Sequence, residues 1–326
     1  MAAVATAPAG RSPRWIVNRG VDLSLVIGSA FAGYVYLVLY TALHVKISLL
    51  WWFWSVGFDG THIFATASRT YFDPESRARD RNLLYGSLVV FFSLGPLMVL
   101  VGQKGLLALL VGVWAYYHVI RQHYGFLVLY KVKNRDLLPL DNTLDRVFLG
   151  VMMIFPPFHR FFIHHPEELG IRLAFPQAEP VLWAIVGITA AVWLARQWGR
   201  FQRNIPKYLL LAAIVPLHWL TFAYMSWQAA VPTVTIVHNL QYHALVWFHN
   251  RNRYGQATVL SRSILAYAGT ALLFSALYRI PGFQLGQVSD LAFGFFCGFG
   301  LTHYYLDSRI WRVRHDPGLR EALQLA

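Results

Sequence analysis

Two six-residue segments that lie wholly within predicted membrane spans each begin and end with histidine. They read HVIRQH, from His118 to His123, and HNLQYH, from His238 to His243. Both lie inside apolar runs, and imidazole is the side-chain group that most often binds metals in proteins. On an ideal α-helix the two rings of such a pair point about 140° apart, because each residue turns the helix by about 100°. The spacing therefore favours two metals, or one metal bound across a π-bulge, over simple chelation by one pair.

Three further histidines lie on the same kind of segment. His62 and His303 each follow a threonine, in the stretches THIFATASR and THYYLDSR, and His249 follows the second histidine pair. Counted from the outer ends of the predicted helices at 1.5 Å per residue, four of the histidines lie about 20 Å deep, namely His62, His118, His243 and His303. The sequence therefore predicts a metal site in the cytoplasmic half of a membrane. The predicted ligands are His62, His118, His123, His238, His243 and His303, with His249 as an extra ligand.

Two carboxylates accompany these histidines. Asp59 lies three residues before His62, and Asp307 lies four residues after His303. Residues three or four apart share one face of a helix, so each carboxylate is expected beside its histidine. A carboxylate in that position can orient the imidazole or bind the metal directly. We therefore predict that both carboxylates act at the site.

Three other polar residues complete the predicted site. Gln122 lies one turn after His118, and Asn239 lies one turn before His243. Both amides can donate hydrogen bonds to ligands or to a substrate. Arg121 is a cation within a predicted membrane span, where charged side chains are costly without a partner. Its expected partner is one of the two carboxylates or the anionic head group of a substrate.

The remaining histidines are expected to have ordinary structural roles. His44 and His218 are predicted to form interhelical hydrogen bonds. His315 lies in the C-terminal tail. A position at the membrane interface is expected for the predicted outer-loop group of His159, His164 and His165.

The elements that must position these residues are membrane helices. The chain has 326 residues, of which 56% are hydrophobic and 13% charged, whereas soluble domains have about 25% charged residues. Apolar runs of about 20 residues recur along its length, which is typical of transmembrane helices. We predict an all-α polytopic transmembrane helical bundle, a single integral-membrane domain over residues 1–326 with about ten spans. The predicted spans are 22–46, 48–68, 83–101, 105–130, 147–163, 180–196, 207–226, 230–249, 263–280 and 288–308.

The basic residues predict the orientation of these spans. Of the 28 lysines and arginines, 22 fall in predicted cytoplasmic segments and five in outer segments when the N-terminus is placed in the cytoplasm. This asymmetry follows the positive-inside rule. Both termini, residues 1–20 and the tail 310–326, are therefore predicted to be cytoplasmic. The net charge of +13 is explained by topology and by attraction to anionic lipids, so no nucleic-acid partner is expected. The expected location is the bacterial inner membrane, with the site on its cytoplasmic side.

The predicted ligands indicate which metal the site would hold. Neutral imidazoles with an occasional carboxylate suit iron, zinc or copper. Six or seven histidines are more than one closed zinc site needs, which indicates two metal ions. Iron is the expected metal, and copper and zinc stay open. The single cysteine, Cys297, excludes a disulfide or a cysteine-based metal knuckle within one chain.

The histidine motifs also carry a resemblance to a group of known enzymes. Histidine-rich motifs at the cytoplasmic ends of membrane helices resemble those of integral-membrane di-iron oxygenases, namely fatty-acyl desaturases, hydroxylases and alkane monooxygenases. The segment QHYG, from Gln122 to Gly125, is similar to the histidine-tyrosine-glycine box of the alkane hydroxylases. A looser similarity links the scattered histidines to carotene-cleaving membrane oxygenases. The resemblance implies a metal-dependent oxidoreductase that uses O2 and acts on a lipid-like or apolar substrate. An external electron-donor protein is expected, because the sequence has no flavin or nicotinamide fingerprint.

Three other functions stay open. A b-type haem electron-transfer protein needs only two axial histidines, which would leave at least four predicted ligands unexplained. A transporter for metal ions or protons is favoured by the faint duplication of the histidine motifs, although carboxylates are scarce in the spans. A purely structural membrane protein is the remaining alternative.

Overall fold

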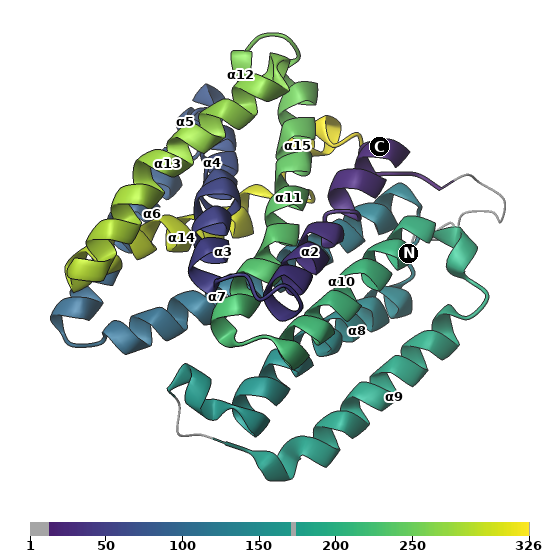
Figure 1. Cartoon of the computed structure of the whole chain (residues 1–326). Helices are drawn as coiled ribbons and strands as arrows, with labels where there is room; N and C mark the ends of the chain where they lie inside the picture. Colours follow the sequence, from purple (N-terminus) through teal and green to yellow (C-terminus); the bar gives the residue numbers. More distant parts are fainter. Residues whose placement is uncertain (1–12, 171–173, 326) are drawn as a thin grey trace. The chain divides into compact units, whose positions relative to one another are not determined.

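The described part of the chain is helical, as the composition predicts. The computed structural model describes residues 13–170 and 174–325, and no strand occurs within these ranges (Figure 1). The helices are α1 (Arg19–Val21), η1 (Asp22–Val26), α2 (Ala30–Thr41), α3 (Ile47–Trp54), η2 (Ser55–Asp59), α4 (Gly60–Arg69), α5 (Pro74–Arg79), α6 (Arg81–Leu100), α7 (Lys104–Lys133), α8 (Pro139–Phe158), η3 (His159–His164), η4 (Pro166–Leu169), η5 (Pro176–Ala178), α9 (Glu179–Gln197), η6 (Phe201–Arg203), α10 (Ile205–Tyr224), α11 (Trp227–Tyr254), α12 (Val259–Arg262), α13 (Ile264–Val288), α14 (Asp290–Ile310) and α15 (Pro317–Ala322). The segments η1, η2 and η3 are π-helices.

The chain divides into two compact units, each made of two separate stretches. The first unit comprises Met1–Trp51 and Ile120–Gln241, and the second comprises Trp52–Val119 and Tyr242–Ala326. Helices α3, α7 and α11 continue from one unit into the other. No long linker in the sequence separates the units, and the expected single membrane domain over residues 1–326 stays a prediction.

The second unit is built around the close packing of α6 and α14. These helices are neighbours, and α13 packs on both α4 and α14 (Figure 1). A Cβ atom built on Gly95 of α6 would overlap the carbonyl oxygen of Gly294 on α14, and one built on Gly294 would lie 2.7 Å from the carbonyl carbon of Gly95. Small residues allow such backbone contact between helices. The two glycines therefore set the spacing of this pair.

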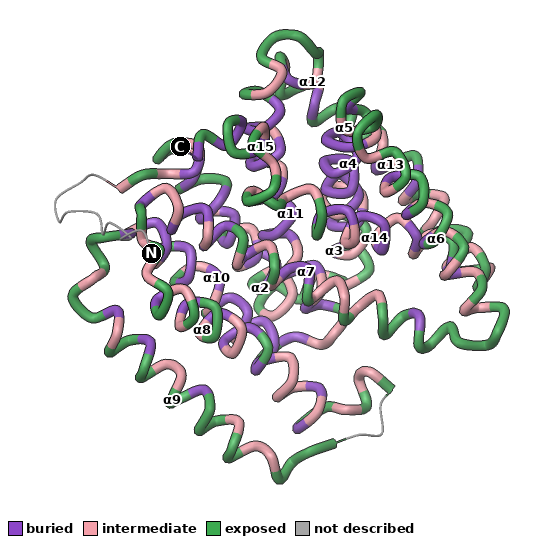
Figure 2. The backbone as a smooth tube through the Cα atoms, turned by 180° about the vertical axis from the view of Figure 1, so that it is seen from behind, coloured by how far each residue is buried: buried purple, intermediate pink, exposed green. Residues whose placement is uncertain are grey.

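Helix α4 is polar and yet completely buried. All ten of its residues are buried, and Figure 2 shows the helix in the colour of buried residues along its length. Its C-terminal residue, Arg69, donates from Nη1 to the carbonyl oxygen of Ile310 at 2.6 Å. The guanidinium of Arg69 also lies 4.1 Å from the ring centroid of Trp311. Protein groups thus replace the water that this helix cannot reach.

The first unit buries a small cluster of charged side chains among its helices. Asp145 on α8 is completely buried and pairs with the ammonium groups of Lys131 and Lys207, the latter at 3.2 Å. Trp193 on α9 donates from Nε1 to the same carboxylate at 2.8 Å. Buried charges are tolerated only when they are paired and hydrogen-bonded. The cluster therefore ties α7, α8, α9 and α10 together.

In the described part of the chain, six helical segments are long and apolar enough to cross a membrane. They are Arg19–Thr41, Arg81–Leu100, Pro139–His164, Pro176–Gln197, Ile205–Tyr224 and Ile264–Val288. Much of their apolar surface is exposed. In the most apolar 18-residue stretch of Pro176–Gln197 only 11% is buried, as the colouring of α9 in Figure 2 illustrates. Exposed apolar helices of this length suit a lipid environment. The chain thus has the helices of an integral membrane protein.

The other four predicted spans are not among these six long apolar segments. They are 48–68, 105–130, 230–249 and 288–308, and they form the helical stretch from α3 to α4 and helices α7, α11 and α14. These helices carry the predicted metal ligands, and polar residues lower their mean hydropathy. The count of about ten spans and the cytoplasmic location of both termini therefore stay predictions.

The contact between α6 and α14 can be tested with two alanine substitutions on one helix. Gly95→Ala is expected to lower the free energy of unfolding by about 1–3 kcal/mol, because the new methyl group meets backbone atoms that cannot move aside. Gly86→Ala is the control, since nothing lies within 4 Å of a Cβ at that position. It should be neutral or stabilising by about 0.5–1 kcal/mol. Thermal unfolding midpoints in detergent measure both, and equal midpoints would contradict the close packing.

Candidate metal centre

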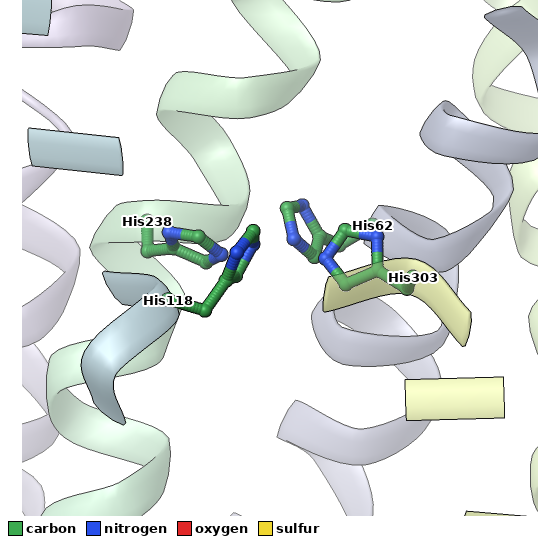
Figure 3. A group of neighbouring side chains, drawn as sticks. All are labelled: His62, His118, His238 and His303. Carbon is green, nitrogen blue, oxygen red and sulfur yellow. The ribbon is translucent and has the colours of Figure 1, made fainter. Parts of the chain in front are cut away.

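Three buried histidines of the second unit converge from three helices. His62 on α4, His118 on α7 and His303 on α14 are 3%, 8% and 2% exposed. The ring centroid of His303 lies 4.4 Å from that of His62 and 4.8 Å from that of His118. Each ring offers a nitrogen within 4.8 Å of the others, and Figure 3 shows the rings turned toward one another. Chain segments that are far apart in sequence thus supply one set of nitrogen donors.

The fourth histidine of this group is His238, also labelled in Figure 3. It lies on α11, which continues without a break into the second unit. Tyr242 follows one turn later, and its ring centroid lies 4.6 Å from that of His62. Because residues i and i+4 share a helix face, α11 presents His238 and Tyr242 on the same side. The four buried histidines could therefore hold a metal ion.

The carboxylate of Asp307 orients His303 through a hydroxyl group. Thr66 donates from Oγ1 to Oδ1 of Asp307 at 2.7 Å, and the same Oγ1 lies 2.7 Å from Nδ1 of His303. Because the threonine proton goes to the carboxylate, Nδ1–H of His303 must donate to Oγ1. This assigns the proton of the neutral imidazole to Nδ1 and leaves a lone pair on Nε2. A ligand histidine held by its other nitrogen is typical of metal sites.

Tyr242 supplies a second hydrogen bond to the same carboxylate. Its hydroxyl donates to Oδ1 of Asp307 at 2.7 Å and accepts from Nε1 of Trp311 at 3.1 Å. Sequence reasoning missed Thr66 and Tyr242. Signals for both exist, since Thr66 lies one turn after His62 and Tyr242 lies inside the motif HNLQYH.

The structure separates the two histidines of each H-x4-H pair. His118 and His238 belong to the four-histidine group. His123 lies in the first unit, with its ring centroid 5.6 Å from that of His218. His243 has hydrogen-bond partners at both nitrogens, the hydroxyls of Tyr267 and Thr61, each at 3.0 Å. The divergence of the rings on an α-helix accounts for this separation.

The remaining predicted site residues have other contacts. Nδ1 of His249 lies 3.0 Å from Oδ1 of Asn250, and Nε2 of His249 accepts a hydrogen bond from Nε of Arg69 at 3.5 Å. Asp59 pairs with Arg279. Asp307 is thus the predicted carboxylate that contacts the histidine group, through Oδ2 at 3.7 Å from Nε2 of His118.

The three polar residues expected beside the ligands lie in different surroundings. Gln122 donates from Nε2 to the carbonyl oxygen of His238 at 2.7 Å, so it supports the helix that carries this histidine. Asn239 is buried, and its amide makes no hydrogen bond within the described ranges. Arg121 is exposed, and its guanidinium lies 5.6 Å from the ring centroid of Tyr124. Among the described residues its contact is therefore an aromatic ring, and an anionic substrate head group stays a predicted partner.

The donor set fits a metal ion. Nε2 of His303 is buried and has no hydrogen-bond partner among the described residues. A buried polar atom without a partner costs roughly 1–3 kcal/mol, and a bound cation would remove that cost. Neutral imidazoles with a nearby carboxylate suit iron, zinc or copper. The site is thus chemically competent for such a metal.

The hydroxyl link between Asp307 and His303 generates a prediction. Thr66→Val keeps the shape of the side chain but removes the hydrogen bond that fixes the imidazole, so the affinity for a divalent metal should fall about 10–100-fold. Thr66→Ser retains the hydroxyl and should bind metal like the unaltered chain. Metal retained after dialysis against a chelator distinguishes the variants. Equal retention in both variants would show that the hydroxyl does not orient His303.

Comparisons with known proteins identify no relative. No protein-family model matches the chain. No curated protein and no solved structure matches it either. The four-histidine group and its surroundings are therefore the basis for assigning a function.

Proposed function

We propose that the chain is a membrane-embedded, histidine-ligated metal oxidoreductase, an oxygenase that acts on an apolar or lipid-like substrate. The observation that supports this most directly is an apolar pocket that reaches the histidine group in the second unit. A metal site beside an apolar pocket, in a chain with membrane-type helices, suits a substrate drawn from lipid.

The pocket has a volume of about 210 Å³ and its walls are mostly apolar. Aromatic side chains from three helices line it, namely Phe92 on α6, Phe274 on α13 and Phe299 on α14. His303 and Thr302 provide the polar end of the lining, and Thr66, which hydrogen-bonds to Asp307, lies there too. Apolar walls with few polar groups are typical of small-molecule sites. A hydrocarbon chain in this pocket would lie against His303.

The ligands proposed for the metal are His62, His118, His238 and His303. Iron held by such a set supplies O2 activation for attack on an unactivated C–H or C=C bond. Asp307 acts as the positioning carboxylate, because its Oδ1 already accepts hydrogen bonds from Thr66 and Tyr242. The grouped nitrogens support one ion at this centre. A second ion, as the sequence predicts, would need ligands from His123, His243 or His249.

The membrane arrangement expected from the sequence is part of the proposal. The helices that carry the histidines complete about ten spans, and both termini face the cytoplasm of a bacterial inner membrane. The site then lies toward the cytoplasmic side, where an external electron-donor protein can reach it. The positive-inside asymmetry of the basic residues supports this orientation.

The spacing of the rings disfavours the haem alternative. A haem with two axial histidines places its macrocycle between the two rings. The ring centroids of His62 and His118 lie 6.3 Å apart, and His303 lies 4.4 Å and 4.8 Å from them. A third imidazole thus crowds the space that a porphyrin would need.

Metal content and the optical spectrum of detergent-purified protein test the proposed centre. We expect iron that is lost in His303→Ala, and no Soret band. His315→Ala changes an exposed residue of the tail and should retain the iron. Two irons lost together in His303→Ala would support the dinuclear centre predicted from the sequence. A Soret band, or no metal after anaerobic reconstitution, would refute the proposal.

The role of the pocket is tested by filling it. Ala67 lines the pocket, so Ala67→Phe should place a ring where the substrate binds and abolish most lipid-dependent oxygen consumption. Val89→Phe on the exposed face of α6 is the control. An oxygen electrode measures consumption with extracted membrane lipid as substrate and ascorbate as reductant. The metal content should stay the same in both variants, and unchanged consumption in Ala67→Phe would contradict the substrate assignment.

A further inference from the structure

A third pair of histidines with the same spacing lies in the first unit, outside the centre already described. His159 and His164 begin and end η3. Their ring centroids lie 4.4 Å apart, and their Nε2 atoms lie 3.2 Å apart. In contrast to the other two pairs, these rings converge.

The type of helix explains the convergence. A π-helix closes its hydrogen bonds from residue i to i+5 and has a wider turn than an α-helix, so side chains five residues apart diverge much less than on an α-helix. The preceding prolines interrupt the α-helical pattern, since Pro156 has no N–H to donate to the carbonyl oxygen of Met152. The indole Nε1 of Trp219 donates to that carbonyl instead, at 2.8 Å. The π-helix then begins at His159, directly after α8.

A carboxylate from another helix completes the group. Glu179 is the first residue of α9, and its Oε1 lies 2.9 Å from Nε2 of His159 and 3.4 Å from Nε2 of His164. The three donor atoms therefore form a triangle with sides of 2.9, 3.2 and 3.4 Å. With metal–ligand bonds of about 2.0–2.1 Å, two ligands of a tetrahedral zinc ion lie about 3.3 Å apart. The triangle thus has nearly the size of one face of such a site.

The surroundings leave this triangle available to a cation. Arg160, between the two histidines in sequence, pairs with Glu168. His165 lies 3.2 Å from Glu167. Within the described ranges, the ion pairs of Glu179 involve His159 and His164 alone. The side chains of His159, His164 and Glu179 are 23%, 47% and 35% exposed, so an ion in solution can reach them.

We propose that His159, His164 and Glu179 form a second metal site, which binds Zn²⁺ and leaves one coordination position open to solvent. Two imidazoles and one carboxylate are a donor set that zinc prefers, and three protein ligands leave the fourth tetrahedral position free. The ion would join the end of η3 to the start of α9, which are separated in sequence by η4 and η5. This site does not depend on the proposed oxygenase function.

Zinc titration of the full-length chain in detergent, in competition with a chromophoric chelator, tests the site. His164→Ala should lower the affinity of this site for zinc by at least about 100-fold. Removal of a residue that only hydrogen-bonds to a metal ligand lowers the affinity by about 10–100-fold, so a larger loss indicates that His164 binds the ion itself. Glu179→Gln retains a hydrogen-bonding side chain but loses the charged oxygen, so it should also weaken binding. His165→Ala is the control, because this exposed neighbour pairs with Glu167 instead. The metal content of the four-histidine group should be the same in all three variants.

Two further measurements separate a metal site from a hydrogen-bonded network. Zinc should raise the thermal unfolding midpoint of the unaltered chain and of His165→Ala, but not that of Glu179→Gln. Cobalt substitution should give the visible absorption of a tetrahedral site, and this band should disappear in His164→Ala, or in His164→Asn if the alanine variant aggregates. Zinc affinity that is unchanged by both His164→Ala and Glu179→Gln would overturn the proposal.

Discussion

The four-histidine centre depends on the burial of one carboxylate. Asp307 is 7% exposed, and an ionised carboxylate in such surroundings is very costly unless hydrogen-bond donors surround it. Thr66 on α4 and Tyr242 on α11 are those donors, each at 2.7 Å. Satisfying the carboxylate on α14 therefore requires three helices to meet at one point. The same threonine hydroxyl orients His303, so one interaction serves both the packing of the helices and the geometry of the ligand.

This requirement explains why α4, which carries several polar side chains, is buried along its whole length. Lipid cannot satisfy polar side chains, whereas neighbouring helices can. Arg69 illustrates the point, because the carbonyl oxygen of Ile310 and the ring of Trp311 surround its guanidinium. The six segments that are long and apolar enough to cross a membrane expose much of their surface instead. Mean hydropathy therefore identifies helices that suit contact with lipid and passes over helices whose polar groups are satisfied by protein.

Sequence reasoning predicted the helices, and the four grouped histidines are among its predicted ligands. Depth calculated from the helix rise did not select these four, because it places His243 rather than His238 level with the other three. Sequence reasoning predicted seven ligands, whereas the structure groups four of them. His243 is an example of the difference, since the hydroxyls of Tyr267 and Thr61 contact its two nitrogens. These partners come from other helices, and no local pattern in the sequence specifies them. Thr66 and Tyr242 do lie close in sequence to predicted ligands, but their contacts with Asp307 join different helices and are seen only in the structure.

The three H-x4-H pairs show that sequence spacing alone does not determine whether two histidines can bind the same ion. In α7 and α11 the α-helical turn directs the two rings of each pair to different surroundings, whereas in η3 the wider turn brings His159 and His164 together. The spacing is identical, so the type of helix decides whether two histidines can share an ion. At η3 that type is linked to Pro156 and to the indole of Trp219, which donates to the carbonyl oxygen left without a partner by the proline. Because Trp219 lies on α10, a contact between helices helps to determine the geometry of a ligand pair only five residues apart.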